Sequence, residues 1–159
     1  MVYYALILGE LFMTRTTARE IAMHLVYELD YHDELPEEIV SAVFHEDYYP
    51  RLAEEMDLYQ EKPNQKQLEY ITFCVKGVYV KKPEIDEIIE KYAVGWKVSR
   101  ISKVSLAVLR LAVFEILYVE DAPTGAVINE AVEIARRYEE EDKVSFINGI
   151  LGSFARERA

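Results

Sequence analysis

The sequence has few of the residues that interrupt helices or cross-link chains. Its 159 residues include one cysteine, six glycines and five prolines. Few glycines and prolines favour a fold of helices over one of many short strands. The lone Cys74 cannot form an internal disulfide, so we expect a reducing compartment, the cytoplasm. Its apolar and aromatic neighbours predict a core side chain, with a reactive thiol as the alternative.

Motifs of catalysis and metal binding are also missing. His24, His32 and His45 lie eight and thirteen residues apart, and no pair has the one-turn spacing of a helical metal site. No glycine-rich phosphate loop, nucleophile elbow or CxxC motif occurs. We therefore expect no enzyme, no metal and no other cofactor, and we place His24 at the edge of the core.

The excess of negative charge is confined to one segment. The net charge is −11, yet residues 28–61 carry twelve acids and one arginine, and the rest carries seventeen of each sign. Negative potential repels phosphate, which argues against nucleic-acid binding on residues 28–61 alone. This segment would suit a basic protein partner electrostatically. We favour the simpler interpretation that it keeps the chain soluble.

The longest apolar run is at residues 105–118. From Leu106 onward it holds only two charged residues, Arg110 and Glu115. A helix that is apolar nearly all round must be covered on most sides, and this one is too short to span a bilayer. We therefore expect the buried central helix of a bundle, capped by Ser102 or Ser105. A buried strand is the alternative.

The remaining pattern predicts about seven helices and no strand. A capping box at Thr17 and Glu20 predicts the start of the first helix. A third helix over 65–79 and a fourth from Pro83 are expected to be separate, and Trp96 is expected to be a core plug after the fourth. The other expected features are a helix over 36–45, a short one within 47–63, one after the 121–125 turn, an acidic loop at 139–142 and a final helix.

The amino end offers two further hypotheses. Residues 1–12 lack the basic start of a signal peptide, and we interpret them as an extension upstream of a natural start at Met13. A true N-terminal segment packed on the body is the alternative. Arg15 and Arg19 lie at the start of a helix, where free amides favour anions such as a phosphate backbone. Alternatively, these arginines are solvated or pair with Glu20.

Several blocks of the sequence together resemble the NusB family of bacterial transcription antitermination factors. Either of the two most specific blocks would be weak alone: Ile128-Asn129-Glu130-Ala131 and Phe146-Ile147-Asn148-Gly149. The resemblance covers residues 14–156. Its other blocks are Ala18-Arg19-Glu20, Leu25-Val26-Tyr27, Trp96, Arg100-Ile101, residues 108–118 and Pro123.

The resemblance implies an all-α fold of two packed sub-bundles, residues 13–80 and 81–159, around the central helix. It implies that single-stranded boxA RNA is bound jointly with NusE, a ribosomal small-subunit protein, in the transcription elongation complex, notably on ribosomal RNA operons. Amides at helix starts would meet the RNA and an aromatic ring would stack on a base. The implied RNA contacts are Arg15, Arg19, Asp121, Thr124, Gly125, Lys143, Ser145, Phe146 and Asn148.

Three charged residues within the expected helices also match the family, and we interpret them as structural. Arg110, Glu115 and Glu130 fit the pattern of the family, and a buried charge is costly unless it is paired. We therefore expect a structural ion pair of Arg110 with Glu130 or Glu115.

Departures from the family pattern keep other functions open. Thr16 and Thr17 stand where the family has basic residues, and Gly125 and Ser145 stand where lysine is common. Each lost cation lowers the RNA affinity, because one fewer counterion is released when RNA binds. We therefore expect weak RNA binding by the chain alone. The alternative function is a scaffold that forms a homodimer or binds another protein, with little RNA binding. The domain that precedes some RNA methyltransferases is disfavoured, because no catalytic domain follows.

Overall fold

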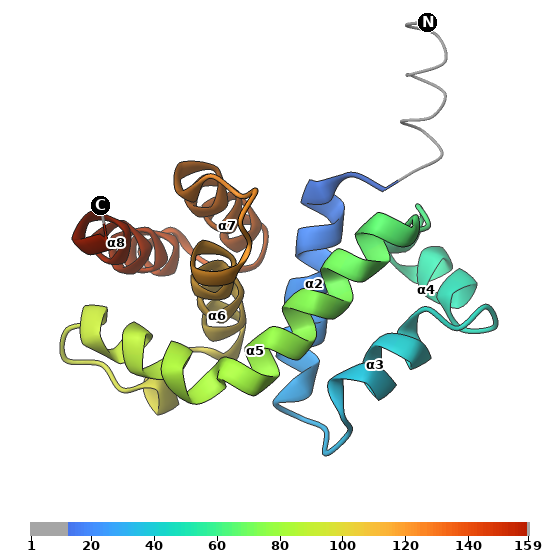
Figure 1. Cartoon of the computed structure of the whole chain (residues 1–159), viewed down its shortest axis with the longest axis horizontal. Coiled ribbons are helices and arrows are strands. Elements are labelled where there is room, and N and C mark those ends of the chain that lie inside the picture. The colour runs from blue at the N-terminus through green and yellow to red at the C-terminus, as the bar shows by residue number, and fades with distance from the viewer. Residues whose placement is uncertain (1–12, 159) are drawn as a thin grey trace, which may run out of the picture. The chain divides into compact units, whose positions relative to one another are not determined.

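The computed structural model describes residues 13–158 (Figure 1). Within that range the all-α class is confirmed, because no strand occurs. The expected extension, residues 1–12, lies outside the described residues. The seven described α-helices are α2 (Arg15–Leu29), α3 (Pro36–Val43), α4 (Tyr49–Glu55), α5 (Gln65–Tyr92), α6 (Lys103–Tyr118), α7 (Thr124–Tyr138) and α8 (Glu141–Arg158), with 3-10 turns η1 (Asp57–Tyr59) and η2 (Val98–Arg100).

The chain forms two compact units, the first ending at Lys76 and the second beginning at Gly77. In the first unit α2 contacts α3 and η1, and in the second α6 contacts α7 and α8. The long helix α5 supplies residues to both units.

The core of the first unit includes Ile21 and Leu25 of α2 and Ile71 and Cys74 of α5, all buried. Burial raises the pKa of the Cys74 thiol to about 12, although the charges of Arg19 and Arg15 act in the opposite direction. The prediction that Cys74 is a core side chain is therefore confirmed, since the thiol is neutral and covered.

The start of α2 differs from the expected capping box. The hydroxyl of Thr14, not Thr17, caps the helix by accepting a hydrogen bond from the Thr17 amide at 3.1 Å. Glu20 lies beyond the first turn and is buried. The expectation was wrong because two threonines with cap chemistry stand three residues apart, and the earlier one is used. Arg15 thereby becomes the first residue of the helix.

Pro83 does not begin a helix, contrary to the expectation from sequence. It lies inside the 28-residue helix α5, which is continuous from Gln65 to Tyr92. An internal proline removes one helix hydrogen bond and costs about 3 kcal/mol. On both sides of it, Val78, Ile85 and Ile89 are buried at helical spacing. Burying each such side chain contributes roughly 1.5–3 kcal/mol, which outweighs the cost of the proline.

Helix α6 confirms the expected buried central element within the second unit. All residues from Leu106 to Glu115 are buried. The Ser102 hydroxyl caps the helix by accepting a hydrogen bond from the Ser105 amide at 3.3 Å, so of the two candidate caps the structure uses Ser102. The alternative of a buried strand is excluded.

Arg110 of α6 has a partner that the sequence pattern did not indicate. Its Nε and Nη2 atoms donate hydrogen bonds to the two carboxylate oxygens of Asp86, at 2.8 and 2.9 Å. The Arg110 side chain is 5% exposed and that of Asp86 is 23% exposed. A bidentate pair of this kind satisfies a buried guanidinium and fixes α6 against α5. The expected pairing with Glu115 or Glu130 stays a prediction.

Gly77 of α5 lies against the Phe114 ring of α6. A Cβ atom at this position would lie 2.1 Å from Cζ of Phe114. Only a residue without a side chain leaves room for the ring there, so the glycine sets how closely the two helices pack.

We expect Gly77→Ala to lower the free energy of unfolding by about 1–3 kcal/mol, because the added methyl group overpacks the core. Gly149→Ala is the matched control: it is also a helical glycine, but nothing lies within 4 Å of its Cβ position. The control should stabilise the protein by up to about 1 kcal/mol through helix propensity. Urea denaturation measures both changes. Equal effects of the two substitutions would contradict the packing argument.

Candidate nucleic-acid interface

The start of α2 places Arg15 and Arg19 in different surroundings. The Arg15 guanidinium lies over the Tyr70 ring, 4.1 Å from its centroid, and the residue is half-buried. Arg19 is 7% exposed and has interactions within the protein. Stacking on an aromatic ring leaves the edge of a guanidinium able to donate hydrogen bonds. Arg15 is therefore the better placed of the two for an external anion.

The start of α7 presents backbone donors. Thr124 and Gly125 are its first two residues, both exposed, and the preceding Pro123 provides no side-chain cap. The first amides of a helix have no partner within the helix, and they attract anions. Asp121, two residues before Pro123, is exposed and adds a negative charge to the same turn. The α7 start is thus a weak anion site by its own chemistry.

The start of α8 is more acidic than the resemblance implied. The helix begins at Glu141, so the acidic loop expected at 139–142 is shorter and both Glu141 and Asp142 lie in the first turn. Acids at this position stabilise the helix by interacting with its dipole, and they repel phosphate. Among the candidate residues of α8, Ser145 and Asn148 are exposed.

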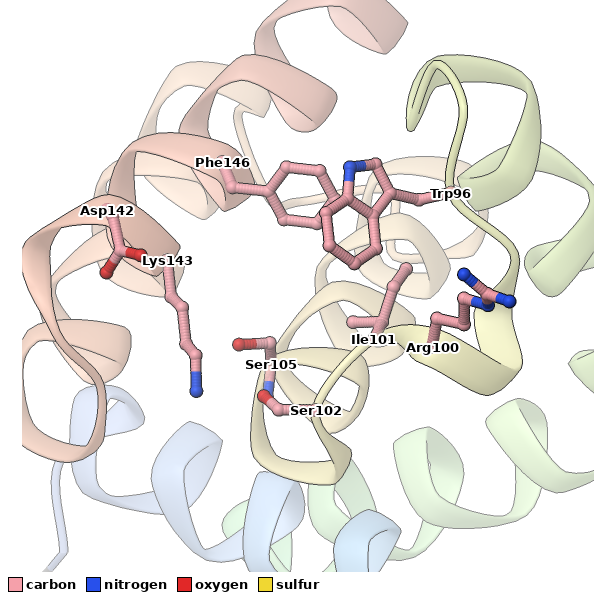
Figure 2. A pocket seen from close by; sticks show the side chains of 8 residues that line it. All are labelled: Trp96, Arg100, Ile101, Ser102, Ser105, Asp142, Lys143 and Phe146. Carbon is pink, nitrogen blue, oxygen red and sulfur yellow. The ribbon is translucent and has the colours of Figure 1, made fainter.

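Lys143 and Phe146 line a pocket in the second unit (Figure 2). Its volume is about 380 Å³. Aromatic rings form one wall, hydroxyl groups lie opposite, and charged side chains stand at the sides. The lining residues are Trp96, Arg100, Ile101, Ser102, Ser105, Asp142, Lys143 and Phe146.

Trp96 is not the core plug that the sequence led us to expect. It is 50% exposed, and its ring meets the Phe146 ring edge to face, with centroids 5.8 Å apart. The turn between α5 and α6 holds the indole at the pocket wall, because Gly95 adopts a φ of 83° that favours glycine. Trp96 and Arg100 are functional candidates that we missed. The signal was an aromatic residue followed closely by two cations, Lys97 and Arg100.

Glu139 ties the pocket floor together. It accepts hydrogen bonds from the hydroxyls of Ser102 at 2.6 Å and Ser105 at 3.0 Å, and it pairs with Lys143 at 3.4 Å. Burial by itself raises the pKa of Glu139, but the two serine hydrogen bonds and Lys143 outweigh it, so the pKa lies below its usual value. The carboxylate therefore stays ionised and neutralises part of the Lys143 charge.

Of the residues predicted to bind RNA, the structure brings two, Lys143 and Phe146, to one pocket. The α7 start lies in the same unit but does not line this pocket, and Arg15 and Arg19 belong to the first unit. In the described part of the chain, no group of three metal-ligating side chains occurs. Nor do its helices include one long and apolar enough to cross a membrane.

These features define an all-α protein with a candidate nucleic-acid interface at the ends of its helices. Comparison with known proteins is more specific, because the sequence profile of the NusB family matches residues 16–156. The chain belongs to the NusB family. The transcription antitermination protein NusB of Acetivibrio thermocellus is 46% identical over 140 residues, which cover 88% of this chain and 87% of that protein. The NusB of Ruminiclostridium cellulolyticum is 40% identical, with 91% and 90% coverage.

Solved structures agree with this assignment. T. maritima NusB superposes with a TM-score of 0.69 at 29% identity, covering 92% of this chain and 93% of that chain. A crystal structure of the antitermination factors NusB and NusE in complex with double-stranded RNA contains a chain that matches with a TM-score of 0.70. That chain is 26% identical, with 90% and 96% coverage.

Glu139 provides a test of the pocket floor. We expect Glu139→Gln to lower the free energy of unfolding at pH 7 by about 1 kcal/mol, because the charged acceptor is lost. The folded pKa of Glu139 lies below its ordinary value of 4.5. The advantage of the wild type is therefore complete above that value and disappears as the pH falls through the folded pKa.

Urea denaturation across a pH series measures this difference. Glu140→Gln is the control, since Glu140 is the exposed neighbour in the sequence. It should change stability little at any pH. A Glu139 effect of constant size down to low pH would contradict the assignment.

Proposed function

We propose that this protein is a transcription antitermination factor that binds boxA-type single-stranded RNA together with NusE. It acts in the cytoplasm within the transcription elongation complex, notably on ribosomal RNA operons, and it catalyses no reaction. The observation that carries the proposal is the family match over residues 16–156. The NusB relative crystallised with NusE and double-stranded RNA supports NusE and RNA as the two kinds of partner.

The chemistry of the described surface supports contacts of three kinds. Arg15 and Lys143 would meet phosphate groups, and Thr124 and Gly125 would offer amides. Phe146 would stack on a base. Arg19, Asp121, Ser145 and Asn148 complete the proposed set.

The same surface predicts a low RNA affinity for the protein alone. Arg19 is buried, Lys143 is paired with Glu139, and Glu141 and Asp142 occupy the α8 start. Each of these reduces the positive charge that RNA meets, and RNA affinity depends strongly on that charge. NusE would supply the missing cations and surface.

The acidic segment of residues 28–61 supports a second candidate function. This function is a protein-binding scaffold that acts as a homodimer or with another partner and binds little RNA. The segment of residues 28–61 belongs to the first unit and carries twelve acids against one arginine. A surface of this charge repels nucleic acid and attracts basic proteins. Selective RNA binding distinguishes the two functions.

We expect the isolated protein to bind a labelled boxA RNA weakly at physiological salt, and NusE to increase the affinity strongly. Fluorescence anisotropy with a scrambled RNA as the control measures both steps. Tight binding without NusE would contradict the electrostatic argument. Absence of selective binding with and without NusE would favour the scaffold.

Lys143 should carry one phosphate contact in the complex with NusE and RNA. We expect Lys143→Ala to make the slope of log K against log salt shallower by about 0.7, the value for one lost contact to a single strand. Lys91→Ala is the matched control, because Lys91 is likewise exposed and paired with a glutamate, Glu157, at 3.3 Å. If both variants shift the slope equally, Lys143 has no specific role.

A further inference from the structure

The turn that joins α5 to α6 combines positive charge with exposed apolar side chains. Residues 91–103 include four lysines or arginines and no acid. Val94 and Trp96, within that stretch, are 87% and 50% exposed. Single exposed apolar side chains are common on protein surfaces, but two of them beside cations are typical of a contact surface. The basic turn, as we call it, consists of Val94, Trp96, Lys97 and Arg100.

Two cations of the basic turn are not neutralised by the protein itself. Lys91, just before the turn, is paired with a glutamate of α8 at 3.3 Å. By contrast, the exposed side chains of Lys97 and Arg100 form no ion pair with any residue that the structure describes. The carboxylate of Glu90 accepts a hydrogen bond from the Val98 amide at 2.9 Å, so it is engaged by the backbone of the turn. Lys97 and Arg100 therefore remain available to an external anion.

A loop of the first unit has the opposite charge and the same arrangement. Between α2 and α3, Tyr31 is 55% exposed and Leu35 is 50% exposed. Asp33 and Glu34 lie between them in the sequence, and both are exposed. Within residues 13–158, neither carboxylate forms an ion pair. The acidic loop, as we call it, consists of Tyr31, Asp33, Glu34 and Leu35.

Hydrogen bonds fix the backbone of both surfaces. In the acidic loop, the Leu35 amide donates to the Glu38 carboxylate at 3.2 Å, and the Tyr31 amide donates to a carbonyl of α2 at 3.0 Å. In the basic turn, the Trp96 amide donates to the Ala93 carbonyl at 2.8 Å. Two surfaces that are already fixed lose less entropy on docking than flexible ones do.

A second copy of this chain carries the surface that matches the basic turn. Each of the two surfaces offers two exposed apolar side chains and two unpaired charges, and the charges are of opposite sign. Opposite charges steer and orient an encounter, and burial of the apolar groups stabilises it. Solubility alone would account for the acids of the loop, but it gives no reason for exposed Tyr31 and Leu35 beside them.

We infer that the protein self-associates, with the basic turn of one copy docked on the acidic loop of another. Two short segments form the contact, so its area is below that of a stable dimer and the association is weak and reversible. Trp96 and Arg100 also line the pocket of the second unit (Figure 2), so a docked copy would cover this pocket. The inference does not depend on the proposed RNA binding.

Analytical ultracentrifugation of the full chain measures self-association directly. We expect the average mass to rise with protein concentration at about 0.1 M salt, where the Debye length is about 10 Å. The mass should fall towards that of the monomer at about 1 M salt, where the Debye length is about 3 Å. A monomer at every concentration overturns the inference, and so does an association that salt leaves unchanged or strengthens.

Charge reversal identifies the two surfaces. The first variant combines Lys97→Glu with Arg100→Glu, and the second combines Asp33→Lys with Glu34→Lys. Each variant alone should stay monomeric, because its two surfaces then have the same sign of charge. A mixture of the two should associate again, since each variant keeps one native surface that the other can meet. A mixture that stays monomeric overturns the inference.

A matched control separates a specific contact from net charge. Glu54→Lys combined with Glu55→Lys reverses two exposed neighbouring acids of the same segment, residues 28–61, outside the acidic loop. This control changes the charge as much as the acidic-loop variant does, and it should still self-associate. An equal loss of association in both variants would overturn the assignment of the loop. Urea denaturation identifies any variant that is unfolded.

The apolar side chains are tested at constant charge. Val94→Ser should weaken self-association roughly tenfold, as expected when a valine is no longer buried. Val80→Ser is the control, because Val80 is 60% exposed and lies outside the basic turn. Equal effects of the two substitutions would overturn the assignment.

Trp96 provides an independent readout, because it is the only tryptophan of the chain. Its emission should shift to shorter wavelength as wild type associates, since a docked copy removes the indole from water. An unchanged emission while the mass rises would place the contact elsewhere and overturn the inference.

Discussion

Burial of α6 is the constraint on which the second unit depends. A helix apolar on nearly every side must be covered, and α7 and α8 pack against it. The one buried cation near its middle, Arg110, then requires an anion, and Asp86 of α5 provides a bidentate one. Gly77 lets the Phe114 ring approach the same helix. The ends of these helices, and the pocket among them, take their positions from this packing.

The candidate interface lies at the helix ends, where polar groups are not buried in the core. Ser102 caps α6 and also donates to Glu139, so one residue fixes the helix start and the loop before α8. Glu139 in turn holds Lys143 beside the pocket. The structural network thus sets both the position of the candidate RNA-binding cation and its effective charge.

The charge of this protein makes the proposed RNA binding depend on its partners. The excess of negative charge lies in residues 28–61, and acids also occupy the start of α8. Phosphate recognition at such a surface has to rely on a few cations, on helix amides and on aromatic stacking. Stacking depends little on salt compared with ion pairing, so the proposed contact of Phe146 with a base would contribute relatively more here than in a more basic protein.

The sequence by itself determined the helical class, the buried α6, the core position of Cys74 and the family, because apolar periodicity and motif spacing are local properties. It could not determine that α5 continues through Pro83, that Asp86 pairs with Arg110, or that Trp96 borders a pocket. Each of these depends on side chains brought together from distant positions. Burial of Val78 and Ile89 outweighs the proline, helix packing selects the ion-pair partner, and the left-handed turn at Gly95 places the indole at the surface. Only the tertiary structure decides such competitions, since they compare packing energies that no local pattern contains.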